Sequence, residues 1–191
     1  MDEVEIGESL DELIVASLQE AQSASEPSDK LHHLKRTEEL LLNRESGAHL
    51  IDNFLDEMLQ FAAHPQSSIK CFVISFIERA CKKDAEVMRK AVNTLTFLLM
   101  ADGDSNVQVT KKAMSACTNI YSIVLRWVVS TRGDQDVKSC WDSFCQLKAR
   151  IMFHIDNDNE GIRTMVIKFL EAVVLAQSTK TDQSENGSKD Q

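Results

Sequence analysis

Glycine and proline are scarce in this sequence, and no stretch alternates apolar and polar residues as a strand would. Only 6 glycines and 2 prolines occur among 191 residues. Most of them lie where periodic segments break, at Pro27, Gly47, Pro65, Gly103, Gly133 and Gly161. Few breakers and no strand pattern favour an all-helical protein. The apolar segments are short and interrupted by charge, so the sequence predicts no membrane span.

A basic leader is also missing. Residues 1–12 carry six acids and no base, the reverse of a secretory signal, so none is expected. These acids account for six of the formal net charge of −9, and the rest of the chain is only mildly acidic. A nucleic-acid binder would normally present a basic face, so no direct nucleic-acid contact is expected.

The cysteines do not form a disulfide or zinc pattern. There are 5 of them, an odd number, and all fall inside predicted helices on or beside apolar stripes. They are typical of reduced, small hydrophobic residues in an intracellular compartment. Cys140 and Cys145 lack the Cys-x-x-Cys spacing of a tetrahedral zinc site, and no His-x-x-x-His pair completes one.

Apolar residues recur at helical spacing, most clearly between Asp156 and Gln177. One helix face there consists of Ile162, Met165, Val166, Phe169, Leu170 and Val173. The same design begins at Ile69 and at Val109, and the three starts are 40 and 53 residues apart. A turn or cap residue is expected four positions before each start, at Pro65, Ser105 and Asp158.

The whole pattern predicts eight helices joined by short loops. They cover about 9–22, 28–43, 49–63, 67–83, 84–100, 106–129 and 136–155, and an eighth follows the DNDNEG turn and ends near 177. Eight helices make about four antiparallel pairs, and a period in the forties is typical of a HEAT- or armadillo-like α-solenoid. A closed helical bundle is the competing architecture, but it would not require a shared register in alternate helices.

Three regions follow from this pattern. Residues 1–8 form an acidic N-terminal segment, and residues 9–177 form one HEAT-repeat domain. Residues 178–191 form a polar tail without an apolar residue, and such a tail is expected to be disordered.

The DNDNEG turn is a candidate calcium site. Asp156, Asp158, Glu160 and Gly161 match the first half of an EF-hand loop. The twelfth position should be a bidentate glutamate but is Ile167, and the helix has begun by Arg163. A polar turn between helices is the better interpretation, so no metal or cofactor is predicted.

Catalytic motifs are not found either. A Cys–His nucleophilic pair is not excluded by spacing alone, because such residues meet in space, but no residue singles one out. There is no phosphate-cradling glycine loop and no serine nucleophile elbow. The sequence therefore predicts a protein that is not an enzyme.

A protein-binding surface remains as the candidate site. If the three related helices line one side of a solenoid, their polar positions stack in the rows Lys70/Thr110/Arg163, Ser75/Ser115/Lys168 and Glu78/Thr118/Glu171, with Lys111 and Lys112 beside the middle helix. Concave solenoid faces bind proteins in this way. The alternative for each residue is an ordinary solvated face, and for Arg163 a local ion pair with Asp156 or Asp158.

Four strings resemble the N-terminal HEAT domain of the symplekin family. In order they are LIDNFLDEMLQFA, FVISFIERACKKD, VTKKAM and DNDNEGIRTMVIKFLE, and the resemblance extends over about residues 30 to 177. It implies a non-catalytic nuclear scaffold of pre-mRNA cleavage and polyadenylation, with the cytoplasm as a second location. It also implies docking and stimulation of a phosphatase that acts on the C-terminal repeat tail of RNA polymerase II.

Lys168, in the string IKF, belongs to the docking surface that the resemblance implies. Arg163, Thr164 and Glu171 are added because they lie on the same helix. Lys111 and Lys112 match a VKK string of the family, which implies no role for them. A generic HEAT adaptor for transport or kinase complexes is the alternative function.

The sequence departs from the family after the eighth helix. Symplekins are large proteins whose HEAT domain continues through further helices, whereas this sequence stops soon after Gln177. An uncovered last helix would leave apolar surface in water, so we expect weak stability or self-association at that end.

Overall fold

Helices account for all the regular structure in the residues that the computed structural model describes, which are 9–43, 45–101, 106–131 and 133–185. The predicted all-α, solenoid-type fold class is confirmed. Two compact units make up the chain, residues 1–61 and 62–191. The single continuous domain over residues 9–177 stays a prediction, and the acidic segment 1–8 lies outside the described residues.

The first unit begins with an antiparallel helix pair, α1 (Leu10–Ser23) and α2 (Pro27–Leu42). Ser9 and Glu12 form a capping box at the start of α1, in which Ser9 Oγ accepts from Glu12 N at 3.2 Å and Glu12 Oε2 accepts from Ser9 N at 2.8 Å. The buried Lys30 Nζ donates to the carbonyl oxygens of Ala21 and Gln22, where a cation stabilises the negative end of α1.

The second helix starts earlier than the sequence suggested. The sequence predicted its start near residue 28, but Pro27 already occupies its first turn, where a missing N–H costs nothing. Beyond α2, Gly47 lies so close to the carbonyls of Leu40 and Leu41 that a β-carbon would clash with them.

The third helix is shorter than predicted. The stretch predicted as one helix over 49–63 is an α-helix only over α3 (Ile51–Gln60), flanked by the 3₁₀ helices η1 (Glu45–Leu50) and η2 (Phe61–Ala63). Tighter 3₁₀ turns at helix ends are common and have the same apolar periodicity over such short lengths, so the sequence pattern does not distinguish them.

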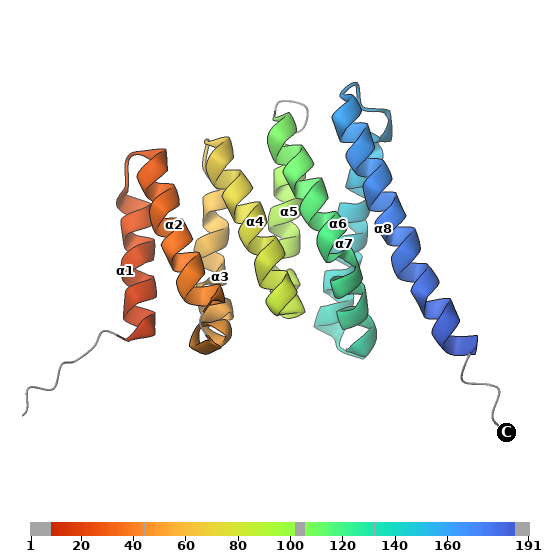
Figure 1. Cartoon of the computed structure of the whole chain (residues 1–191), viewed down its shortest axis with the longest axis horizontal. Helices are drawn as coiled ribbons and strands as arrows, with labels where there is room; N and C mark the ends of the chain where they lie inside the picture. The colour runs from red at the N-terminus through yellow and green to blue at the C-terminus, as the bar shows by residue number, and fades with distance from the viewer. Residues whose placement is uncertain (1–8, 44, 102–105, 132, 186–191) are drawn as a thin grey trace, which may run out of the picture. The chain divides into compact units, whose positions relative to one another are not determined.

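The second unit stacks its helices in two layers. Its elements are α4 (Ser67–Lys83), η3 (Ala85–Val87), α5 (Met88–Ala101), α6 (Val107–Ser130), α7 (Gln135–Phe153), η5 (His154–Asp156) and α8 (Glu160–Glu185). Helices α4, α6 and α8 lie side by side in one layer, and α5 and α7 lie behind them in the other (Figure 1). The last helix continues past the predicted end at Gln177, so the polar tail starts as helix in the structure.

The three helices of the front layer share the predicted register. Ile69, Val109 and Ile162 are each the third residue of their helix, and each is completely buried. The caps of α6 and α8 were predicted one residue too early, at Ser105 and Asp158. In the structure Asn106 Oδ1 accepts from Val109 N at 3.3 Å, and Asn159 Oδ1 accepts from Ile162 N at 3.2 Å. A capping oxygen reaches the N–H three residues ahead, not four. In α4 the N-cap is Gln66, whose side chain makes no capping bond, and Ser105 lies outside the described residues.

Arg89 links the two layers. Its Nη2 donates to Asp134 Oδ2 at 2.9 Å, and its guanidinium lies 5.7 Å from the centroid of the Trp127 ring. Asp134 is also the N-cap of α7, and its Oδ1 accepts from Asp136 N at 2.8 Å and from Val137 N at 3.3 Å. These backbone bonds, with Arg89 added, hold the pKa of the Asp134 carboxyl below its usual value.

Aromatic rings fill the space between α6, α7 and α8. The Tyr121 ring centroid lies 5.9 Å from that of Phe144 and 5.7 Å from that of Phe169. All three side chains are almost completely buried, and such ring pairs stabilise the fold beyond the contribution from burial of their apolar surface. The cluster fixes the orientation of α8 and therefore decides which of its residues face solvent.

Candidate protein-binding surface

The side of α8 that points away from α6 carries the candidate site. Ile162, Val166 and Phe169 are completely buried, whereas the predicted stripe members Met165, Leu170 and Val173 are only half-buried. On the opposite side lies a set of exposed residues that we call the α8 face: Thr164, Ile167, Lys168, Glu171 and Val174. They recur at three- and four-residue steps, so they form one stripe along the helix.

Two opposite charges lie within the α8 face. Lys168 and Glu171 are exposed and three residues apart. Within the described part of the chain, no hydrogen bond or ion pair joins either of them to another residue. Thr164 Oγ1 donates to Glu160 O at 3.0 Å, inside the helix. Lys168 and Glu171 are therefore available to a partner, and an exposed charge steers association over a distance.

Arg163 has a structural role in the turn before α8. Its Nη1 donates to Asn157 O at 2.7 Å and to Asp158 O at 3.0 Å. The expected local partners were the carboxylates of Asp156 or Asp158, and the observed acceptors are backbone carbonyls of this turn. The half-buried guanidinium thus supports the backbone from which α8 begins.

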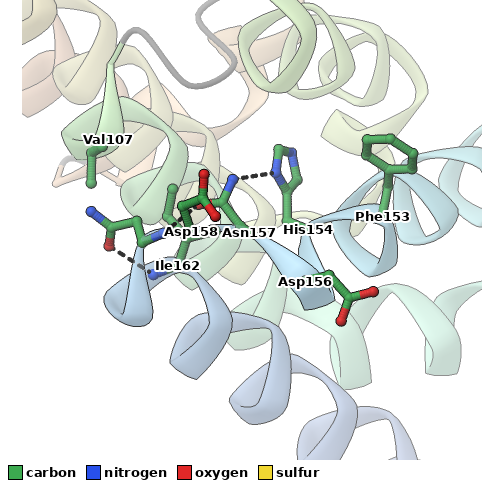
Figure 2. Close-up of a pocket in the computed structure, with 8 residues that line it drawn as sticks. Val107, Phe153, His154, Asp156, Asn157, Asp158 and Ile162 are labelled. Carbon is green, nitrogen blue, oxygen red and sulfur yellow. Dashed lines mark hydrogen bonds between the residues drawn. The ribbon is translucent and has the colours of Figure 1, made fainter.

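The turn itself forms a polar hollow of about 770 Å³ (Figure 2). Asn157 Oδ1 accepts from Asn159 N at 2.9 Å, and His154 Nδ1 lies 3.4 Å from Asn157 Nδ2. Figure 2 shows Asp156 projecting away from Asn157 and His154. Because α8 has begun by Glu160, the side chains of this turn do not follow a calcium loop. The described residues contain no group of three or more side chains suited to a metal ion.

Helix α6 contributes one of the two predicted lysines to the start of α8. The end of the Lys111 side chain lies so close to Gly161 that a β-carbon there would clash with it. Lys111 and Lys112 are both half-buried. Thr110, the middle member of a predicted surface row, is completely buried and donates to Asn106 O at 3.2 Å. That row is therefore not a continuous surface.

The buried thiols are poorly suited to nucleophilic chemistry. Burial raises the pKa of Cys117 to about 12 and that of Cys140 to about 11, and it also raises the pKa of Cys81. The thiolate is the reactive form, so a raised pKa disfavours nucleophilic attack by these three cysteines. No helix in the described ranges has the length and apolar content to cross a membrane.

Sequence reasoning missed the two apolar members of the α8 face. Ile167 is 51% exposed and Val174 is 59% exposed. The helical pattern alone does not identify them, because an apolar residue beside a buried stripe is usually assigned to the core. Alignment of the three front-layer helices would not have found them either, because the matching positions in α4 and α6 are apolar or aromatic and so also predict a place in the core.

Part of the chain is similar to a known protein family. Residues 106–191 match the family described as Symplekin/PTA1 N-terminal. The matched range contains α6, α7 and α8 and so includes the whole α8 face. Of the four strings that carry the resemblance, VTKKAM and DNDNEGIRTMVIKFLE lie within the match, and the two earlier strings lie outside it.

Proposed function

We propose that the chain, whose residues 106–191 match the family described as Symplekin/PTA1 N-terminal, belongs to the symplekin family and that its α8 face docks a phosphatase. Membership supports a scaffold role in mRNA 3′-end processing and implies protein partners in that process. The proposed partner is the phosphatase that dephosphorylates the C-terminal repeat tail of RNA polymerase II. The proposal includes a role in polyadenylation, a nuclear location and no catalysis by the chain itself.

The single observation that supports this proposal is the position of Lys168. It is an exposed cation in the middle of the α8 face, and its row partners on the neighbouring helices are the half-buried Ser75 and Ser115. A partner that approaches the front layer at α8 therefore meets a positive charge beside the apolar Ile167. An apolar contact flanked by complementary charge is typical of protein interfaces.

The other predicted contact residues support Lys168 in different ways. Thr164 and Glu171 share its face, so they are proposed as direct contacts. Arg163 lies in the first turn of α8, and the Lys111 side chain reaches Gly161 from α6, so both are proposed to position α8, together with Lys112, which follows Lys111 on α6. If a partner contacted only the turn before α8, its binding would depend on Arg163, Lys111 and Lys112 and not on Lys168.

Reversal of charge at Lys168 tests the proposal. We expect Lys168→Glu to weaken phosphatase binding about tenfold, which corresponds to about 1.4 kcal/mol, because an attractive charge becomes repulsive. The matched control is Lys138→Glu, at a lysine that is also exposed but lies on α7 in the other layer, and this change should leave binding unchanged. Binding is measured by calorimetric titration of the purified phosphatase.

The far-ultraviolet circular dichroism of both variants should equal that of the unmodified chain, since both side chains are exposed. Unaltered phosphatase affinity in Lys168→Glu would contradict the proposed site. Absence of any binding by the unmodified chain would contradict the proposed partner. Affinity purification followed by mass spectrometry would then identify the complex that a generic HEAT adaptor serves.

A further inference from the structure

The α8 face occupies the position that α4 and α6 use to contact the next helix of the layer. In the shared register, Ile167 corresponds to Ile74 and Met114, which are both completely buried. Val174 corresponds to Cys81 and Tyr121, of which Cys81 is completely buried and Tyr121 is 1% exposed. Tyr121 of α6 directly contacts Phe169 of α8. Ile167 and Val174, two of the three exposed large apolar residues in the described part of α8, therefore lie where a neighbouring helix packs elsewhere in this layer.

The charged residue of the α8 face shows the same relation. Glu171 corresponds to Glu78 of α4, whose Oε1 accepts from Asn119 Nδ2 of the next helix, α6, at 2.9 Å and from Lys82 Nζ at 2.7 Å. No described residue donates to Glu171. The α8 face thus lacks two things that the equivalent face of α4 has, an apolar cover and a hydrogen-bond donor for its glutamate.

We propose that a second copy of this chain covers the α8 face, through a two-fold symmetric, antiparallel pairing of α8 with α8. A two-fold axis between Leu170 and Glu171 places Ile167 opposite the partner's Val174. Residues equally far from this axis exchange places, as an isologous interface requires. The same operation places Lys168 level with position 173 of the partner, two residues from the partner's Glu171. At a rise of about 1.5 Å per residue, Lys168 and the partner's Glu171 are then offset by about 3 Å along the helix axis, within reach of each other.

The charges make the pairing self-complementary. One helix supplies both a cation and an anion, so the dimer contains two equivalent Lys168–Glu171 pairs. In antiparallel and parallel helix pairs, such flanking ion pairs set the choice of partner and the orientation. Their exposed position makes each pair weak, so burial of Ile167 and Val174 supplies most of the association free energy.

Dimer formation would regulate docking, since it pairs Lys168 with the partner's Glu171 and covers the α8 face. Phosphatase docking and pairing of α8 would then exclude each other, and the phosphatase would bind the monomer. This consequence depends on the proposed function, whereas the pairing itself does not. The two can therefore fail separately.

The test is sedimentation velocity of the full 191-residue chain over a range of concentrations, with charge variants. We expect a concentration-dependent dimer. Lys168→Glu and Glu171→Lys should each raise its dissociation constant about tenfold, because each places like charges opposite one another. The double variant carrying both substitutions should return it to within about twofold of the unmodified value, because the ion pairs re-form with their signs exchanged.

Ile167→Ser removes apolar contact without a change of charge and should also weaken the dimer. A chain that stays monomeric at every concentration would overturn the proposal, and so would a dimer that neither single reversal weakens or that the double variant does not restore. Phosphatase binding separates the two functions. The partner's charges do not change, so docking should stay weak in the double variant even when the dimer is restored.

Discussion

Arg163 is the residue that connects the turn before α8 to the helix itself. One guanidinium nitrogen donates to two consecutive carbonyls, Asn157 O and Asp158 O. Buried or half-buried carbonyls need such partners, and a charged donor makes a stronger bond than a neutral one. The same residue was selected from the sequence as a contact residue, and its role toward a partner stays a prediction.

We expect Arg163→Ala to lower the free energy of unfolding by about 1–2 kcal/mol, because two charge-assisted hydrogen bonds are lost from the turn. The matched control is Lys168→Ala on the same helix, which should change stability by less than about 0.5 kcal/mol since the side chain is exposed. Urea unfolding followed by circular dichroism measures both. Equal stability of Arg163→Ala and the unmodified chain would show that these bonds contribute nothing.

The residue-scale details of this turn could not be read from the sequence. Composition predicted a polar turn in place of a calcium loop, since Ile167 stands where a bidentate ligand is needed, and the absence of calcium stays a prediction. The acceptors of Arg163 depend on the backbone path of 154–159, because a guanidinium chooses among nearby oxygens by geometry. Charge pairing alone suggested carboxylates, and the turn instead directs carbonyl oxygens toward Nη1.

Asn106 acts at the scale of the element, because it both starts α6 and ties it to α4. Its Oδ1 accepts from Val109 N at 3.3 Å, and its Nδ2 donates to Ser67 Oγ at 2.5 Å. The first bond is local to α6, and the second joins the starts of two neighbouring helices in the front layer. One side chain thus sets both the beginning of a helix and its register against the next.

Two substitutions separate these roles. Asn106→Ala removes both bonds and should cost about 1–2 kcal/mol of unfolding free energy. Asn106→Asp keeps the capping oxygen but loses the donor to Ser67, so it should cost less than Asn106→Ala. Thermal unfolding ranks the two variants. If Asn106→Asp proved as destabilising as Asn106→Ala, the cap would not be the larger contribution.

Helix boundaries were predictable to different degrees. The bounds of α4 agree with the prediction, because its apolar stripe begins and ends sharply between Gln66 and Asp84. The end of α8 was predicted too early, since a polar sequence carries no periodic signal to follow beyond Gln177. Three of the caps were misplaced by one residue or more because several turn residues precede each helix and only geometry selects among them.

At the scale of the whole molecule, two units are built from the same kind of antiparallel helices. The second unit repeats one packing arrangement, in which α6 covers α4 and α8 covers α6. Internal repetition was visible in the sequence as the shared register of Ile69, Val109 and Ile162. What the register could not show is which copy faces solvent, because exposure of Ile167 depends on the helix that packs beside it and not on its own sequence.

Recognition of the α8 face by another protein is the central function proposed for the whole molecule. Lysine-reactive footprinting read by mass spectrometry tests this most directly, with the chain at a concentration low enough to be monomeric. On addition of the phosphatase we predict that modification of Lys168 falls severalfold, because the interface excludes the reagent, while modification of Lys138 on α7 stays the same. Equal modification of Lys168 with and without a saturating amount of bound phosphatase would contradict the account.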